Sequence, residues 1–313
     1  MSHPAGQAPD EDWSQRPERS NAFTLSLMRW IALRCGRTVA RCVLHPITLY
    51  FVLFAPVPRR QSKRYLTRAL GRDAGWADVY RHFHTFTATV LDRVYLLHGR
   101  MDLFDIRLHD EEQVDSALEE GRGVFLFGAH VGSFEVLRAV GDRTRERRIA
   151  MVMYPDNARL INQALRAVAP DYRPEIIALG RRGSMLAVRD WLDGGGLAGL
   201  LADRALPGES TRADRIDIDF LGHPARFSDG PFRLAALLQR RVLFMVGLYV
   251  GGNRYEVHFA PLADFRTPAT DPAERDRQIR AAVSAYALQL EMACRKQPYN
   301  WFNFHDFWHE GST

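Results

Sequence analysis

The chain has 313 residues, 46% of them hydrophobic and 25% charged, enough for one large globular domain, or two small ones, with a substantial core. The net charge of +5 is uneven: residues 19–72 hold eleven Lys and Arg and no Asp or Glu, while the remainder holds 31 basic and 37 acidic residues. The three cysteines show no metal-binding or disulfide spacing, which favours a reduced, cytosolic protein over a disulfide-rich secreted one.

The N-terminal part of the chain divides into two segments. Residues 1–20 are polar and contain prolines, which predicts a disordered tail. Residues 21–72 are apolar and basic, and Arg34, Arg37 and Arg41 recur at helical spacing with apolar residues between them. This pattern predicts a helical segment lying in a membrane interface, with arginines among anionic headgroups. The uncharged run 42–57 has only 16 residues and two prolines, which disfavours a spanning helix because one needs about 20 apolar residues.

A basic, apolar segment can also be a nucleic-acid site, a secretory signal, or a helix packed on the protein's own core with a basic solvent face. Nucleic acid is disfavoured because the cations alternate with Leu, Ile, Phe and Trp, and no DNA- or RNA-binding signature is present. A signal peptide is disfavoured because twenty polar residues precede the first apolar block. Membrane lipids are therefore the expected partner, with the packed helix as the alternative.

From residue 73 onward, apolar runs of strand length alternate with segments of helical periodicity. The predicted helices are 76–98, 114–120, 131–140, 158–168, 184–192, 231–239 and 275–295. The predicted strands are 124–127, 149–153, 175–179, 197–202, 216–220, 242–250 and 255–259, the last near a sheet edge. This alternation predicts one layered α/β domain over residues 73–313, with a largely parallel central sheet and flanking helices, plus the N-terminal membrane-associating helical segment.

The most informative motif is His130 followed five positions later by Glu135, directly after the predicted strand 124–127. Open α/β sheets bind ligands at the carboxyl ends of their strands, so His130 is a candidate general base. Glu135, one helical turn further on, is expected to fix its tautomer, and free N–H groups at the start of the helix would stabilise an oxyanion. The alternative is a helix-capping histidine followed by a solvated glutamate.

Three further patterns are discounted. Residues 194–199 match G-x-G-x-x-G, but the match follows a helix and opens a strand, the reverse of a dinucleotide site. No G-x-S-x-G occurs, which disfavours an α/β-hydrolase, and Ser133 is better explained as a helix-capping residue than as a nucleophile. Residues 305–309 resemble H-E-x-x-H with Asp in place of Glu, but no third ligand is evident, so no metal is predicted there.

Several segments together resemble the lipid A biosynthesis acyltransferase family, within the lysophospholipid acyltransferase superfamily, of which the chain is identified as a divergent member. Residues 128–135 match the family's His-x4-Asp/Glu motif, and the basic apolar N-terminus stands where these enzymes attach to the inner membrane. Residues 201–204, 220–222 and 224–231 resemble the block with an Asp-Gln pair and a small-residue loop. Residues 297–305 resemble the aromatic end of the family.

The resemblance implies substrate-binding roles for five residues: Arg181, Arg182, Asp203, Arg204 and Ser228. The arginines would hold a phosphate of the acceptor or the donor, since guanidinium pairs well with phosphate, and Asp203 would order Arg204 or the acceptor. The alternatives are a solvated turn for Arg181 and Arg182 and a structural salt bridge for Asp203. Arg204 replaces the family's Gln, and the loop around Ser228 also departs from the family, which concerns the acceptor more than the chemistry.

The function implied is transfer of a fatty acyl chain from an acyl carrier protein or coenzyme A thioester to a lipid hydroxyl. The expected location is the cytoplasmic face of the bacterial inner membrane, with the protein monotopic or peripheral. His130 would be the base and Glu135 its partner; a thioester is already activated, so neither cofactor nor metal is expected. The alternatives are acylation in a secondary-metabolite pathway of the aryl-polyene type, a non-catalytic lipid-binding protein of this fold, and a lipid hydrolase. Oligomeric state is not predicted.

Overall fold

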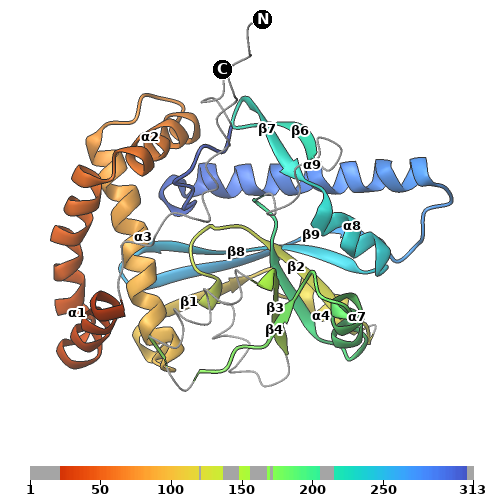
Figure 1. Cartoon of the computed structure of the whole chain (residues 1–313), viewed down its shortest axis with the longest axis horizontal. Coiled ribbons are helices and arrows are strands. Elements are labelled where there is room, and N and C mark those ends of the chain that lie inside the picture. The colour runs from red at the N-terminus through yellow and green to blue at the C-terminus, as the bar shows by residue number, and fades with distance from the viewer. Residues whose placement is uncertain are drawn as a thin grey trace, which may run out of the picture.

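A computed structural model describes residues 22–119, 121–136, 148–155, 168–169, 172–204 and 215–308, with only the backbone for 22–29. A seven-stranded sheet in the order β1-β9-β8-β2-β5-β3-β4 forms the centre of the protein (Figure 1). Its strands are β1 (Asp105–His109), β2 (Val124–Gly128), β3 (Ile149–Met153), β4 (Ile176–Ala178), β5 (Leu197–Leu201), β8 (Arg241–Gly251) and β9 (Arg254–Asp264). The predicted α/β class with a largely parallel sheet is thus confirmed.

Two strands run against the other five. β9 is antiparallel to β8 because the two are joined by a tight turn, in which Gly251 and Gly252 have φ values of 106° and 64°. Such positive φ values suit glycine. β1, which the sequence did not predict, pairs in parallel with β9 and forms the sheet edge. The predicted strand 216–220 is β6 (Arg215–Phe220), which lies outside the central sheet and pairs with the unpredicted β7 (His223–Ser228).

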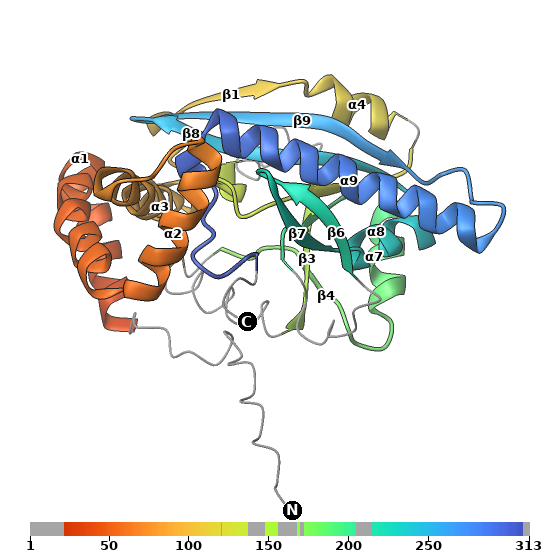
Figure 2. The same ribbon diagram turned by 90° about the horizontal axis from the view of Figure 1, so that it is seen from above.

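The helices cover both faces of the sheet and one end of the molecule (Figures 1 and 2). They are α1 (Ala22–Phe54), α2 (Pro56–Leu70), α3 (Trp76–Leu97), α4 (Glu112–Leu118), α7 (Ser184–Asp193), α8 (Gly230–Leu237) and α9 (Pro272–Lys296), with short 3-10 turns η2 (Met101–Leu103) and η4 (Pro298–Asn300). Five of them match predicted helices to within three residues. The predicted tail 1–20 and residues 158–167 of the helix 158–168 lie outside the described residues, as do residues 137–140 of the helix 131–140. The start predicted for that last helix was wrong, because residues 131 and 132 form isolated β-bridges and helical structure begins at residue 134.

The core is divided by the sheet. One face of β2 and β8, including Phe127 and Phe244, packs with Tyr286 of α9 and Phe232 of α8. The other face packs beneath α4 with Val114, and all five residues of β2 are buried. Burial on both sides explains why β2 reads as a continuous apolar run rather than as an alternating pattern.

The N-terminal helices pack on α3 at the end of the sheet (Figure 2). α1 is interrupted at Gly36, whose φ of 80° departs from helical geometry, and it contains Pro46. Its part Trp30–Phe54 has 25 residues and a mean hydropathy of 1.2, long and apolar enough to cross a membrane by length and composition. The uncharged run 42–57 therefore gave too short a length for the apolar helix. The helix extends further toward the N-terminus, through a part that contains single arginines.

Two arginines of α1, Arg37 and Arg41, do not face outward as the sequence predicted, whereas Arg34 is exposed. Arg37 donates two hydrogen bonds, of 2.8 and 2.9 Å, to the fully buried carboxylate of Asp92 on α3. Arg41 donates to the same carboxylate at 2.8 Å and to the Tyr249 hydroxyl at 2.7 Å. Because these two charges are satisfied inside the protein, the outer side of α1 carries mainly apolar side chains, together with Arg34. The exposed apolar residues of this region are Trp30, Leu33, Val39, Leu49, Tyr50, Phe51, Leu53, Phe54 and Val57.

Candidate active site

His130 and Asp203 come together because they follow neighbouring parallel strands. β2 and β5 pair with Gly128 opposite Leu201, and each strand is followed two residues later by one of the two side chains. The carboxyl ends of parallel strands lie at the same end of the sheet. Because each residue is two positions past a paired strand end, His130 lies beside Asp203. The His130 side chain is 33% exposed and therefore open to a ligand, whereas the Asp203 side chain is 2% exposed.

The Asp203 carboxylate holds His130 at two points. Asp203 Oδ1 lies 2.8 Å from His130 Nδ1, and Oδ2 accepts the His130 backbone N–H at 3.0 Å. The indole Nε1 of Trp301 also donates to Oδ2, at 3.0 Å. Burial alone would raise the pKa of the Asp203 carboxyl. The neighbouring charge and hydrogen bond of His130, the charge of Arg204 and the Trp301 hydrogen bond outweigh it and hold that pKa well below its usual range.

The ionised Asp203 fixes the tautomer of the imidazole. A carboxylate only accepts hydrogen bonds, so His130 Nδ1 carries the proton and donates it to Asp203. Nε2 then bears the lone pair, which is the arrangement a general base requires.

The loop that carries His130 is paired with the C-terminal segment of the chain. Phe302 N–H donates to the His130 carbonyl and Gly132 N–H donates to the Asn300 carbonyl, both at 2.8 Å. The next residue is fixed to β8, because Ser133 N–H donates to the Gly247 carbonyl at 2.8 Å. A Cβ at position 132 would lie 1.9 Å from that same carbonyl oxygen, so only glycine allows this close approach.

These contacts correct one expectation about the oxyanion. The N–H groups of His130, Gly132 and Ser133 are already used by Asp203, Asn300 and Gly247. They cannot also bind a developing negative charge without losing those partners. A backbone N–H that stabilises an oxyanion must therefore belong to a residue other than these three.

His82, buried on α3, continues the hydrogen-bonded network to the N-terminal helices. Its Nε2 lies 2.9 Å from the carbonyl oxygen of Trp301, and its Nδ1 lies 2.8 Å from Ser62 Oγ on α2. A carbonyl only accepts, so Nε2 donates and Nδ1 accepts from the serine. Burial lowers the pKa of His82 to about 4, although its hydrogen bond to the Trp301 carbonyl acts in the opposite direction. The neutral imidazole of His82 thus fixes the backbone of Trp301, and the indole of Trp301 in turn hydrogen-bonds to Asp203.

Glu135 does not occupy the position expected of it. Its Oε1 lies 2.8 Å from Arg93 Nε of α3, and its Oε2 accepts from Ser133 Oγ at 3.2 Å. Within the described residues, Glu135 makes no hydrogen bond to His130, and Asp203 makes the orienting bond instead. Between positions 130 and 135 the chain changes from a loop to a helix, and this change of direction points the Glu135 side chain toward α3. A catalytic role for Glu135 remains a prediction.

The other predicted substrate-binding residues are dispersed. Arg181 and Arg182 are exposed in the turn between β4 and α7, two strands beyond β5 at the same sheet edge. Arg204 follows Asp203, and its Nη2 donates a long hydrogen bond of 3.4 Å to the Phe302 carbonyl. Burial lowers the pKa of Arg204, the charge of Asp203 opposes this change, and its buried Nε has no partner among the described atoms. Ser228 is buried, and its Oγ accepts the Gly230 N–H at 3.2 Å at the start of α8, a structural contact.

A histidine–carboxylate pair thus lies at the carboxyl ends of two central parallel strands of an α/β protein. Residues 84–310 match the family model of bacterial lipid A biosynthesis acyltransferases. The chain belongs to that family and is an acyltransferase, which confirms the resemblance found in the sequence. Comparison with curated proteins gave no significant match.

Sequence reasoning did not anticipate the roles of Trp301 and His82, or the bond between Asp203 and His130. The signal for that bond was nevertheless present, because His130 and Asp203 each follow a predicted apolar strand. What the sequence did not provide was the order of the strands, which makes β2 and β5 neighbours although β3 and β4 lie between them in the chain.

Proposed function

We propose that the protein transfers an acyl chain from an acyl carrier protein or coenzyme A thioester to a hydroxyl of a lipid acceptor, with His130 as general base. The observation that carries this proposal is the bond from His130 Nδ1 to the buried Asp203, which in the neutral imidazole leaves the Nε2 lone pair on a partly exposed ring at the carboxyl end of β2. Family membership supplies the reaction class, acyl transfer to a lipid.

In the proposed reaction, Nε2 of His130 takes the hydroxyl proton as the acceptor oxygen attacks the thioester carbonyl carbon. Asp203 stabilises the imidazolium that forms, and Trp301 keeps the carboxylate in place. Collapse of the tetrahedral intermediate breaks the carbon–sulfur bond, and the imidazolium returns the proton to the leaving thiolate. The products are an ester and a free thiol. Arg204, next to Asp203, is the arginine best placed to hold a substrate phosphate, while Arg181 and Arg182 are candidates further along the same edge.

The test is an acyl-transfer assay on membranes that contain the wild-type protein or His130→Ala, with labelled acyl carrier protein and acyl-coenzyme A supplied in parallel. We expect an acylated lipid from the wild type and a loss of about 10²- to 10⁴-fold in His130→Ala. His98→Ala, which changes an exposed histidine at the end of α3, is the matched control and should retain full activity. Normal turnover by folded His130→Ala would reject the mechanism, and free fatty acid as the His130-dependent product would indicate a hydrolase.

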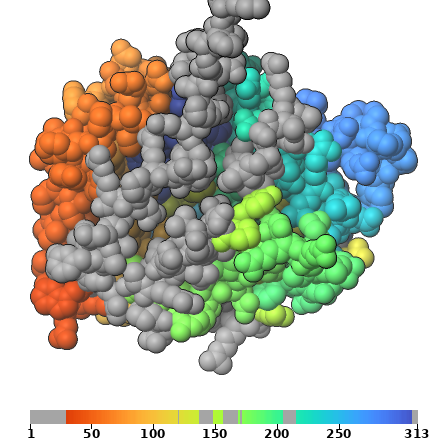
Figure 3. Space-filling model, in the orientation of Figure 1, coloured from red at the N-terminus to blue at the C-terminus, as the bar shows by residue number. Residues whose placement is uncertain are grey.

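The proposed location is the cytoplasmic face of the inner membrane, with α1 and α2 in the interface. The largely apolar outer side of α1 supports this, because Arg37 and Arg41 are turned inward onto Asp92 and Trp, Phe, Tyr and Leu side chains are left exposed. Figure 3 shows these helices forming one end of the molecule. A pocket of about 310 Å³ between α2 and α3 adjoins this surface, lined by Arg59, Arg60, Lys63 and Trp76. Its cations and indole suit anionic headgroups at the interface.

Flotation with anionic vesicles tests the location. Phe54→Glu places a charge on a side chain that is 60% exposed, and we expect it to weaken vesicle binding about tenfold or more. Leu288→Glu, at a 61% exposed position on α9, is the control and should bind as the wild type does. Equal weakening by both variants, or by neither, would reject α1 as the membrane contact.

A further inference from the structure

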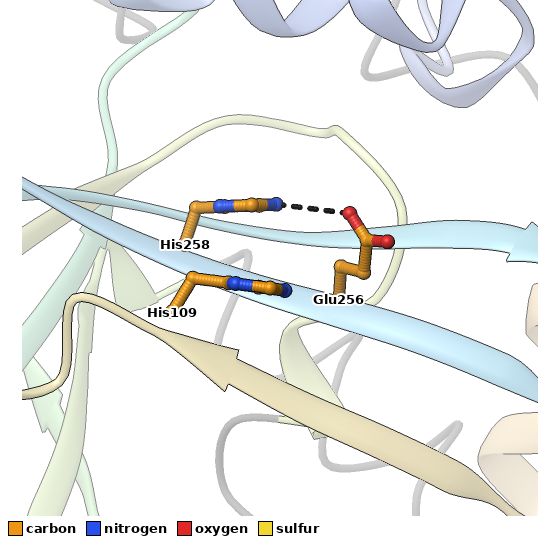
Figure 4. Close-up of side chains that lie close together, drawn as sticks. All are labelled: His109, Glu256 and His258. Carbon is orange, nitrogen blue, oxygen red and sulfur yellow. Dashed lines mark hydrogen bonds and ion pairs between the residues drawn. The ribbon is translucent and has the colours of Figure 1, made fainter.

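A second cluster of chemically active side chains lies at the edge of the sheet, on β1 and β9. His109 and His258 are register partners in this parallel pair, and Glu256 lies two residues before His258 on the same face. The two imidazole rings are stacked, with centroids 4.5 Å apart and planes 10° from parallel. Figure 4 shows both rings and the carboxylate directed to the same place.

The three side chains present one ligand atom each to a common point. A nitrogen of each histidine and a carboxylate oxygen of Glu256 all lie within 4.8 Å of one another. Glu256 Oε2 and His258 Nε2 are 3.2 Å apart, close to the separation of two ligands on a tetrahedral ion with bonds of about 2.0–2.1 Å. Only His109 has to move inward, and its buried Nε2 has no hydrogen-bond partner among the described atoms.

The protonation states of the cluster suit a cation. Burial, together with the charges of Lys296 and His109, lowers the pKa of His258, despite the opposing contacts with Glu256. Burial alone would raise the pKa of Glu256, but the contacts with Lys296 and His258 lower it, so this carboxylate is ionised at neutral pH. Neutral imidazole and ionised carboxylate are the forms that bind metals.

Lys296, in the last turn of α9, places a positive charge against the same atoms. Its Nζ lies 3.2 Å from Glu256 Oε2 and 3.1 Å from His258 Nε2. An ammonium group only donates hydrogen bonds and a carboxylate only accepts them, so His258 Nε2 can bond to Lys296 through its lone pair or to Glu256 through its N–H, but not to both at once. The Lys296 side chain is 51% exposed and can swing away into solvent. It therefore acts as a tethered competitor for the site.

We propose that His109, Glu256 and His258 form a site for a divalent transition-metal ion of the zinc, cobalt and nickel class, which binds by displacing the Lys296 ammonium group. Two imidazoles and one carboxylate favour these ions over Mg²⁺ and Ca²⁺, which prefer oxygen ligands. β1 is an edge strand, so the site opens to solvent and water can complete the coordination. This site is separate from the proposed acyl-transfer chemistry at His130.

The test is a titration of the full-length, chelator-treated protein with Co²⁺, followed by visible absorption, with Zn²⁺ as competitor. We expect one ion per chain in the wild type and at least tenfold weaker binding in His109→Gln and in His258→Gln. Lys296→Met should bind several-fold more tightly, because it removes the competing charge and leaves all three ligands in place. This gain cannot arise from misfolding, so it tests the site even if a histidine variant is unstable.

Two controls exclude binding at positions outside the cluster. His98→Gln changes an exposed histidine that does not belong to this cluster and should bind as the wild type does. Cys35→Ser/Cys42→Ser removes the exposed thiols of α1, and its Co²⁺ affinity should also be unchanged. Binding that survives in both His109→Gln and His258→Gln, or that is not strengthened in Lys296→Met, would overturn the proposal.

Discussion

Trp301 donates its indole N–H to Oδ2 of Asp203 at 3.0 Å, the same oxygen that accepts the backbone N–H of His130. The C-terminal aromatic segment thereby sets the orientation of the carboxylate that orients the candidate base. Trp301 touches no reacting atom in the proposed mechanism and is a positioning residue.

Trp301→Phe should keep most of the packing and lose only this hydrogen bond. A hydrogen bond to a charged group contributes about 1.5–3 kcal/mol, so we expect kcat to fall about tenfold or more. KM should change little, because Trp301 does not contact substrate in the proposed mechanism. Steady-state kinetics on a saturable acceptor separate the two parameters. An increase in KM at constant kcat would assign Trp301 to substrate binding instead.

Asp203→Asn should be far more damaging than its small change in shape suggests. An amide has no charge with which to stabilise the imidazolium, and it can present its NH₂ group to His130 and select the wrong tautomer. We expect kcat to fall about 10²- to 10⁴-fold with the fold retained. Asp217→Asn, on the exposed side of β6, is the control and should show normal activity. Near-normal turnover in folded Asp203→Asn would remove Asp203 from the mechanism.

Glu135 is expected to act together with Arg93, since the two form an ion pair at 2.8 Å. Glu135→Gln and Arg93→Gln should therefore lower activity by similar factors, and the double variant should be little worse than either single variant. A double-mutant cycle for kcat/KM measures this coupling. Additive losses would show instead that Glu135 acts independently of Arg93, as a direct catalytic partner of His130 would.

His82 should make the stability of the protein depend on pH. Its pKa is about 4 in the folded protein against 6.5 for the free side chain, so between these values the unfolded chain binds more protons. Stability is therefore complete above about pH 6.5 and falls as the pH drops toward 4, by about 3 kcal/mol at 1.36 kcal/mol per unit. Urea unfolding of the wild type and His82→Gln from pH 4.5 to 7.5 measures the difference. Identical pH slopes would contradict a neutral buried His82, and His98→Gln should match the wild type.

The ion pairs of Asp92 should dominate the attachment of α1 to the domain. Asp92→Asn leaves Arg37 and Arg41 without their shared counter-charge, and the Tyr255 hydroxyl, which donates to Asp92 at 2.9 Å, loses a charged partner. We expect a loss of about 3 kcal/mol, because removing one partner of a buried ion pair is strongly destabilising. Chemical denaturation provides the measurement. A change below about 0.5 kcal/mol would mean that the arginines are adequately solvated without Asp92.

The parts of the fold that depend on local pattern were predictable. Strands such as 124–127 and helices such as 184–192 carry clear apolar periodicity, and they alternate as an α/β domain requires. β1 was missed because its sequence, Asp105–His109, has only two apolar residues and lies at an edge. The inward arginines of α1 were missed because helical spacing shows that Arg37 and Arg41 share a face, but not that Asp92 lies opposite it.

The site was predictable to a similar extent. His130 follows from its place after a buried strand, whereas its partners at positions 203 and 301 depend on strand order and on the path of the C-terminal segment. Those are long-range properties that no local window contains. Glu135 was preferred because it is near in sequence, but proximity along the chain did not determine which carboxylate contacts the imidazole.

The separation of these partners along the chain has a consequence for biosynthesis. α1 and α2 leave the ribosome before any residue of the site, so the apolar outer surface of α1 is available to a membrane early in translation. His130 is oriented only when residues 203 and 300–302 have also emerged, near the end of synthesis. At the proposed membrane location, a ribosome-bound chain would therefore present α1 to lipid before the proposed base at position 130 could be assembled.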